Sequence, residues 1–162
     1  AKVRSAWLHH FLQNVHKIRP RLVIRMPTFN MTNEEINAIT EGFQARSSVV
    51  TFEDNSKKIV WAEGERDAAK KLFNALACKS CHSIGFSEMD PMSSDLHYAY
   101  KRLRPRWILN WLKNPKAELG FTMMPSFWFN GKSMEDEILD GIPELQRGAL
   151  LKYIQELSYE KI

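Results

Sequence analysis

Apolar residues recur along this chain with the spacing of amphipathic helices. Residues 64–81 carry one apolar stripe at positions i, i+3, i+4 and i+7, formed by Ala69, Leu72, Phe73 and Leu76. Within residues 104–114, Trp107 and Trp111 lie four apart, and Pro105 suits a first helical turn. Residues 143–157 begin with a proline and carry a second stripe, formed by Leu150, Leu151, Ile154 and Leu157. No segment shows a convincing alternation of period two, so the pattern predicts an all-α protein.

Two further segments carry signals for a helix start. Thr32 and Glu35 stand in the relation of a capping box, in which each side chain accepts a hydrogen bond from the other residue's backbone N–H. Ser133 and Asp136 stand in the same relation, so we predict a helix start at each place. Residues 47–64 combine short β-branched runs with a polar middle, and we interpret them as a connection between two halves, with room for a short hairpin.

The two ends of the chain resemble each other. Residues 6–39 read AWLHHFLQNVHKIRPRLVIRMPTFNMTNEEINAI, and residues 106–139 read RWILNWLKNPKAELGFTMMPSFWFNGKSMEDEIL. Both share, in the same order, a tryptophan, a leucine, an asparagine, a Met-Pro-x-Phe motif and an acidic helix start. The distance from tryptophan to the motif's methionine is 19 residues in the first copy and 17 in the second. The shared order favours an internal duplication over a fortuitous match.

Composition narrows the class of protein. With 162 residues, 44% hydrophobic and 26% charged, the chain suits one globular domain, or a small domain with an appendage. No apolar run approaches the roughly 20 residues that cross a bilayer, and the N-terminus does not resemble a signal peptide. The net charge of +4 is too small to identify a partner. Nucleic acid is disfavoured because the basic residues form no long tract, apart from the short cluster YKRLRPRW.

The only two cysteines of the chain, Cys78 and Cys81, are followed directly by His82. A structural zinc site needs four ligands, and the chain has no second cluster at ligand spacing. A thioredoxin-like dithiol belongs between a strand and a helix, and a disulfide across two residues would be strained. The trailing histidine favours the Cys-x-x-Cys-His signal for covalent haem. Each thiol can reach one vinyl group, and the imidazole can reach the iron from the same side.

A haem iron with one histidine ligand has an open sixth position unless a second side chain fills it. Methionine is the soft ligand that a low-spin electron carrier uses there. Met124 stands 42 residues after His82, and Pro125 denies helix to the residue before it. We therefore predict that Met124 lies in extended chain with its sulfur available to the iron, with Met123 as the alternative. A methionine beside aromatic residues is also a common core filler.

These residues give segment 64–158 a resemblance to the class I cytochromes c. The resemblance rests on GERDAAKKLFNALACKSCH, on LRPRWILNWLKNPKAELGFTMMPSF and on the terminal LLKYIQEL. It implies a small helical shell around one covalently attached haem c. The family's anchors would fall on Cys78 and Cys81, its proximal ligand on His82 and its distal ligand on Met124.

The pattern around the methionine is similar to that of c-type domains in multidomain bacterial redox proteins. In such domains a tryptophan and an arginine commonly bind the haem propionates, which by resemblance assigns Trp107 and either Arg104 or Arg106. The alternative is that Trp107 is core and the arginines are solvated. One departure is that Phe73 stands five residues before Cys78, where the family usually has an aromatic residue four before.

The expected domain plan is a partial half-module at 1–46, a linker at 47–63 and the haem-binding domain at 64–162. The half-module resembles only the back half of a cytochrome c domain. Three explanations remain open. The chain is a piece of a longer dihaem protein whose first haem-binding stretch is cleaved off, absent from this sequence or carried by a partner, so that Met26 ligates a second, shared haem; or the half-module is a vestigial docking surface; or the repeat is fortuitous. We interpret the histidines of this segment as surface or partly packed residues rather than ligands: His9, His10 and His16.

The expected function is electron transfer by a His/Met-ligated haem. We expect a relay subunit of a membrane-associated respiratory or photosynthetic complex, with other redox subunits as partners, rather than an enzyme. The alternatives are a haem enzyme or a gas or peroxide sensor with an open sixth site, and a structural subunit. Because covalent haem is attached outside the cytoplasm, the expected location is the periplasm or an equivalent face.

Overall fold

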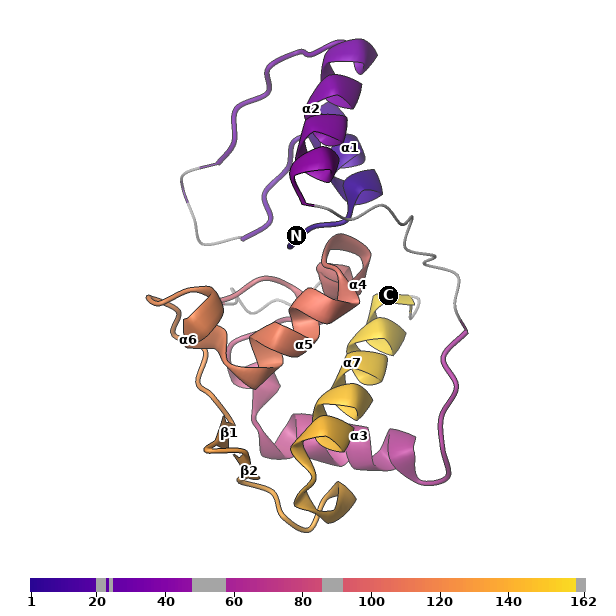
Figure 1. Cartoon of the computed structure of the whole chain (residues 1–162), viewed down its shortest axis with the longest axis vertical. Coiled ribbons are helices and arrows are strands. Elements are labelled where there is room, and N and C mark those ends of the chain that lie inside the picture. Colours follow the sequence, from indigo (N-terminus) through magenta and orange to yellow (C-terminus); the bar gives the residue numbers. More distant parts are fainter. Residues whose placement is uncertain (20–22, 24, 48–57, 86–91, 160–162) are drawn as a thin grey trace.

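The computed structural model describes residues 1–19, 23, 25–47, 58–85 and 92–159. Within these residues the chain forms helices and one very short hairpin, so the predicted all-α class is confirmed. Figure 1 shows two parts, a small one made of the first two helices and a larger one that holds all the others. The helices of the described chain are each too short or too polar to span a lipid bilayer.

The larger part is built on two crossing helices, α3 (Glu65–Ala75) and α7 (Pro143–Tyr159), with α5 (Pro105–Lys113) alongside α7 (Figure 1). The shorter helices between them are η1 (Cys78–Ser80), η2 (Leu96–Tyr98), α4 (Ala99–Arg102), α6 (Pro115–Glu118) and η3 (Leu139–Gly141). The apolar stripes predicted from the sequence meet in one core, which includes Leu72, Phe73, Leu76, Leu150, Ile154 and Leu157. Burial of these stripes is the main force that holds the helices together.

Local residues fix where the main helices begin. Pro105 and Pro143 occupy the first turns of α5 and α7, as predicted. Before α3, Gly64 adopts a left-handed conformation with φ 69°, which glycine tolerates without strain. At the crossing of α3 and α7, Lys152 Nζ lies 2.6 Å from Glu65 Oε2.

A hairpin follows the Met-Pro motif, and the sequence analysis did not predict it. Strands β1 (Trp128–Phe129) and β2 (Lys132–Ser133) pair antiparallel. The turn between them is Asn130–Gly131, with φ values of 52° and 74°. Asn-Gly is the strongest short signal for such a turn, because both of its central residues need positive φ. Each strand has only two residues, so the sequence shows no alternation of apolar and polar positions, and the Asn-Gly turn is its one local indication of a hairpin.

The predicted helix start at Ser133 is wrong. Its hydroxyl donates a 2.7 Å hydrogen bond to Gln146 Oε1 and accepts one from Glu135 N, and no helix begins there. A buried glutamine on α7 thus takes the side chain that would have capped a helix. The capping box at Thr32 is confirmed, because Thr32 Oγ1 accepts from Glu35 N (3.3 Å) and Glu35 Oε2 accepts from Thr32 N (2.8 Å).

The smaller part consists of α1 (Ser5–Gln13) packed on α2 (Asn33–Arg46). Two hydrogen bonds join these helices, from His9 Nε2 to Asn37 Oδ1 and from Gln13 Nε2 to Asn33 Oδ1. The predicted connection at 47–63 falls largely on residues 48–57, which lie outside the described residues. The smaller part meets the larger one at an isolated antiparallel bridge between Val3 and Leu103.

Candidate functional site

The two cysteines and the histidine after them lie in one tight turn behind α3. The helix ends at Ala75, and Ala77 adopts a left-handed conformation with φ 50° and ψ 38° before η1 begins. His82 N then donates to Cys78 O at 3.1 Å, which closes the turn. Ala77 thus separates the end of α3 from the turn that carries Cys78.

The His82 ring is held in one orientation from behind. Its Nδ1 lies 2.8 Å from the carbonyl oxygen of Ser94, and because a carbonyl only accepts, Nδ1 carries the proton. Nε2 then has a free lone pair, which is the form of imidazole that binds a metal. Burial lowers the pKa of His82 below its usual value, so the ring is neutral at pH 7. The segment that returns after the turn is tied down beside it, since Ser93 N donates to Cys81 O at 3.0 Å.

Both cysteines are free thiols. Burial, together with the neighbouring Cys81, raises the pKa of Cys78 to about 11. Reactive redox cysteines have lowered pKa values instead. Among the described residues, no group of three or more His, Cys, Asp and Glu side chains is placed to hold a metal ion, whereas structural zinc needs four such ligands.

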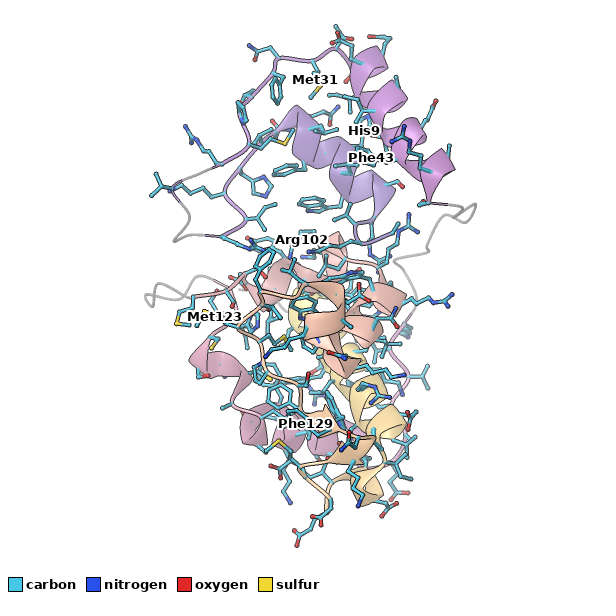
Figure 2. The ribbon with its side chains drawn as sticks, turned by 60° about the vertical axis from the view of Figure 1, so that its left-hand side comes forward. His9, Met31, Phe43, Arg102, Met123 and Phe129 are labelled. Carbon is cyan, nitrogen blue, oxygen red and sulfur yellow. The ribbon has the colours of Figure 1, made fainter. Side chains whose placement is uncertain are left out.

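Met124 is held by α5. Its Sδ accepts a 2.8 Å hydrogen bond from the indole N–H of Trp111, and its backbone N donates to Thr122 Oγ1 at 3.2 Å. Residues 122–126 form neither helix nor strand, as expected before Pro125. The neighbouring Met123 is 83% exposed and points away from the body of the protein (Figure 2). Of the two adjacent methionines, Met124 is the one whose sulfur is positioned.

The turn that carries Cys78 and the segment that carries Met124 pack against the same hydrophobic core. Cys78, Trp107 and Met124 are all partly buried against the cluster formed by α3, α5 and α7. Trp107 stacks on Trp111 at 5.0 Å between ring centroids, so the aromatic pair that holds the sulfur continues to the start of α5. One of the two thiols and the thioether of Met124 therefore pack against the same core.

The two arginine candidates lie in different surroundings. Arg104 is 6% exposed, and its Nε donates to Val3 O at 3.0 Å across the bridge between the two parts. Arg106 is exposed in the first turn of α5. The ammonium of Lys2 lies 4.5 Å over the ring of Trp107. Arg104 is thus positioned by the protein itself, while Arg106 is solvated.

The remaining candidates lie in the smaller part. Met26 is 38% exposed and lies in the loop between α1 and α2. His9 is bonded to Asn37, His10 is exposed and the His16 ring stacks edge-on with Phe11, which fits their interpretation as surface residues.

Sequence reasoning missed three residues around the site. Ser94 orients His82 through its backbone, which no side-chain pattern reports. Trp111 donates to the Met124 sulfur; its spacing from Trp107 was noted, but not its donor. His97 is buried, with Nδ1 2.9 Å from Leu157 O and Nε2 3.4 Å from Lys101 Nζ. Both ring nitrogens of His97 are engaged, so it anchors the end of α7 and is not a free ligand.

This donor set fits a covalently attached haem. Two thiols three residues apart suit the two vinyl groups, the free Nε2 of the adjacent imidazole suits one axial position, and a soft thioether suits the other. The model of the cytochrome c family matches residues 67–158, more than half of the chain. The comparisons with curated proteins and with solved structures returned no match.

Proposed function

The chain belongs to the cytochrome c family, whose members carry covalent haem c and transfer electrons, and we propose that its redox centre is a haem held between His82 and Met124. Haem, when bound, supplies an iron that alternates between the ferric and ferrous states. The residues of the chain would bind this haem, and the groups around it would set its reduction potential.

Cys78 and Cys81 fix the group to the chain. Each thiol would hold one vinyl group of the haem through a thioether bond. That bond needs a reduced thiol, and Cys78 and Cys81 form no disulfide. His82 supplies Nε2, because its Nδ1 proton is committed to Ser94 O.

The observation that carries the proposal is the fixed position of the Met124 sulfur. The Trp111 N–H takes one lone pair of the thioether and leaves the other for a metal. A sixth position filled by a held side chain rearranges little when the iron changes charge, which suits electron transfer. By resemblance, Trp107 and Arg104 would face the propionates; the burial of Arg104 favours it over Arg106 for that role.

We propose the periplasm or an equivalent extracytoplasmic face as the location, because covalent haem is attached outside the cytoplasm. In that oxidising compartment the two thiols would have to be kept reduced until the haem arrives. We further propose that the partners are other redox subunits of a membrane-associated complex. The net charge of +4 gives a mild electrostatic attraction to acidic partner surfaces.

The test compares Met124→Ala with Met123→Ala in the haem-loaded protein. Met124→Ala should abolish the sulfur-to-iron charge-transfer band and allow carbon monoxide to bind the reduced protein rapidly. Met123→Ala should change neither. If the unmodified protein already binds carbon monoxide rapidly, its sixth site is open and the proposal of an electron carrier fails in favour of an enzyme or sensor.

A further inference from the structure

The contacts between the two parts of the molecule are reciprocal. Call the joint residues 2–4 together with residues 102–104. Arg4 N donates to Arg102 O at 2.9 Å, and Arg104 N donates to Lys2 O at 3.0 Å. Adding 100 to the number of the donor and subtracting 100 from the number of the acceptor turns the first hydrogen bond into the second.

The side chains at the joint repeat this exchange. Arg4 Nε donates to Leu103 O and Arg104 Nε donates to Val3 O, both at 3.0 Å. Lys2 precedes the bridge residue Val3, and its ammonium lies 4.5 Å over the ring of Trp107. Arg102 precedes the bridge residue Leu103, and its guanidinium lies 5.9 Å over the ring of Trp7. Figure 2 shows Arg102 where the two parts meet. Contacts in which i touches j and j touches i are the mark of two equivalent units related by a two-fold axis.

The helices that leave the joint also match. The residue before α1, Arg4, has φ −75° and ψ 139°, and the residue before α5, Arg104, has φ −74° and ψ 138°. Each helix has 9 residues and is followed by an asparagine whose N–H donates to the carbonyl four residues earlier. Trp7 stacks on Phe11 at 4.8 Å as Trp107 stacks on Trp111 at 5.0 Å. The matching elements are therefore alike in sequence, backbone conformation and mutual packing.

Apolar surface is exposed in the smaller part at positions whose counterparts in the larger part are packed. In the larger part, α7 packs against both α5 and α3 (Figure 1). Met124 and Phe127 of the Met-Pro motif pack onto the core. In the smaller part α2 packs on α1, and apolar side chains of the motif and of α2 are exposed: Met26 at 38%, Phe29 at 57%, Ile39 at 37% and Phe43 at 62%. These are the surfaces that a front half with its haem would cover.

The joint also carries several positive charges close together, which an anion would stabilise. Arg102 Nε is buried and has no hydrogen-bond partner among the described residues. Burial, with Arg19 nearby, lowers the pKa of Arg102 to about 10, and burial with Arg102 and Arg19 lowers the pKa of Lys2, which Glu118 opposes. A haem carries two propionate carboxylates, and carboxylates would relieve this repulsion.

We propose that α1, α2 and Met26 form the back half of a second haem site, with Met26 as the axial ligand. By the order of elements in the larger part, the segment that attaches this haem stands before Ala1 in the same polypeptide. The assignment of Met26 rests on the proposed role of Met124. The cations of the joint then lie between two haem domains and bind propionate oxygens.

The test uses the haem-loaded full polypeptide and three variants, Met26→Leu, Met124→Leu and Met31→Leu. We expect two covalent haems per polypeptide after denaturation. We also expect Met26→Leu and Met124→Leu each to remove about half of the sulfur-to-iron band, with Met31→Leu as the matched control that removes none. Covalent haem content and helical circular dichroism should stay constant, which separates loss of a ligand from loss of fold.

One haem per polypeptide, or a Met26→Leu spectrum identical to that of the unmodified protein, would overturn the proposal. A second haem found on a separate polypeptide would overturn the placement of the attachment segment. If Met124→Leu alone leaves the band unchanged, the site at His82 fails while the Met26 variant still reports on the second haem.

Discussion

The indole N–H of Trp111 donates a 2.8 Å hydrogen bond to the sulfur of Met124. In the proposed ligation of the iron by Met124, a donor on the sulfur would withdraw electron density from it and so disfavour the ferric state more than the ferrous state. Trp111→Phe keeps the aromatic stack but removes the donor. We expect it to lower the reduction potential by roughly tens of millivolts, measured by potentiometric titration, with the haem content unchanged.

The control for this substitution is Trp61→Phe, since Trp61 lies near Lys152 and away from the sulfur. It should leave the potential as it was. An unchanged potential in Trp111→Phe would show that the bond to the sulfur is lost when the haem is bound.

Ala77 is a non-glycine residue in a left-handed conformation, with φ 50°. The β-carbon makes this conformation unfavourable by about 1 kcal/mol. Ala77→Gly should therefore raise the free energy of unfolding by about that amount, measured by denaturant titration. Ala75→Gly is the matched control. Because Ala75 is in α3, the same chemical change should lower the stability by up to about 1 kcal/mol. Equal signs for the two variants would refute the strain at Ala77.

Gln146 is fully buried and uses all of its hydrogen-bonding capacity. Its Oε1 accepts from Trp128 Nε1 and Ser133 Oγ, and its Nε2 donates to the carbonyls of Glu135 and Ile138, each at 2.7 Å. Gln146→Leu would leave several of these buried groups without partners, at about 1–3 kcal/mol for each group that water cannot reach.

We expect Gln146→Leu to destabilise the fold by about 3 kcal/mol or more, measured by denaturant titration. Leu145→Ala, at the neighbouring half-exposed position, should have a much smaller effect. If the two variants were equally stable, the network would not be what holds the loop between Met124 and α7.

Glu65 and Lys152 join α3 to α7. Partial burial acts to raise the pKa of Glu65, but hydrogen bonds from Lys152 and from Ala62 N outweigh it and lower that pKa below its usual value. A carboxyl group with a lowered folded-state pKa stabilises the fold above its unfolded pKa and loses this effect as pH falls through the folded value. The pair is partly exposed, so it contributes below about 1 kcal/mol.

Glu65→Gln should therefore lower Tm by about 2–4 °C or less at pH 7. The difference from the unmodified protein should shrink at acid pH, below the folded-state pKa of Glu65, where both side chains are neutral. Scanning calorimetry at both pH values is the measurement. Glu63→Gln, which changes an exposed carboxylate nearby, should have little effect at either pH. A difference that grows on acidification would contradict the assigned sign.

Local sequence signals correctly predicted where several of the main helices lie. The prolines that open α5 and α7, the stripe of α3 and the capping box of α2 are local signals, and the structure follows them. Ser133 failed because a distant residue, Gln146, takes its hydroxyl, and a capping pattern contains no information about a competitor on another helix.

The site divides in the same way. The Cys-x-x-Cys-His spacing is a property of one turn of chain and could be read directly. The Ser94 carbonyl and the Trp111 indole act across loops that the sequence does not place, so their roles required the fold. The burial of Arg104 also depends on the smaller part, because its Nε partner is Val3 O.

The reciprocal bonds of the joint run between main-chain atoms and are spread on both sides of Val3 and Leu103. Such a connection has no single pivot, so any swing of one part would have to break every one of these bonds together. These bonds therefore oppose a swing of one part against the other. In the proposed two-haem arrangement, an electron crossing between the parts would meet a gap whose width these bonds help to set, and its transit time would depend on that tunnelling distance.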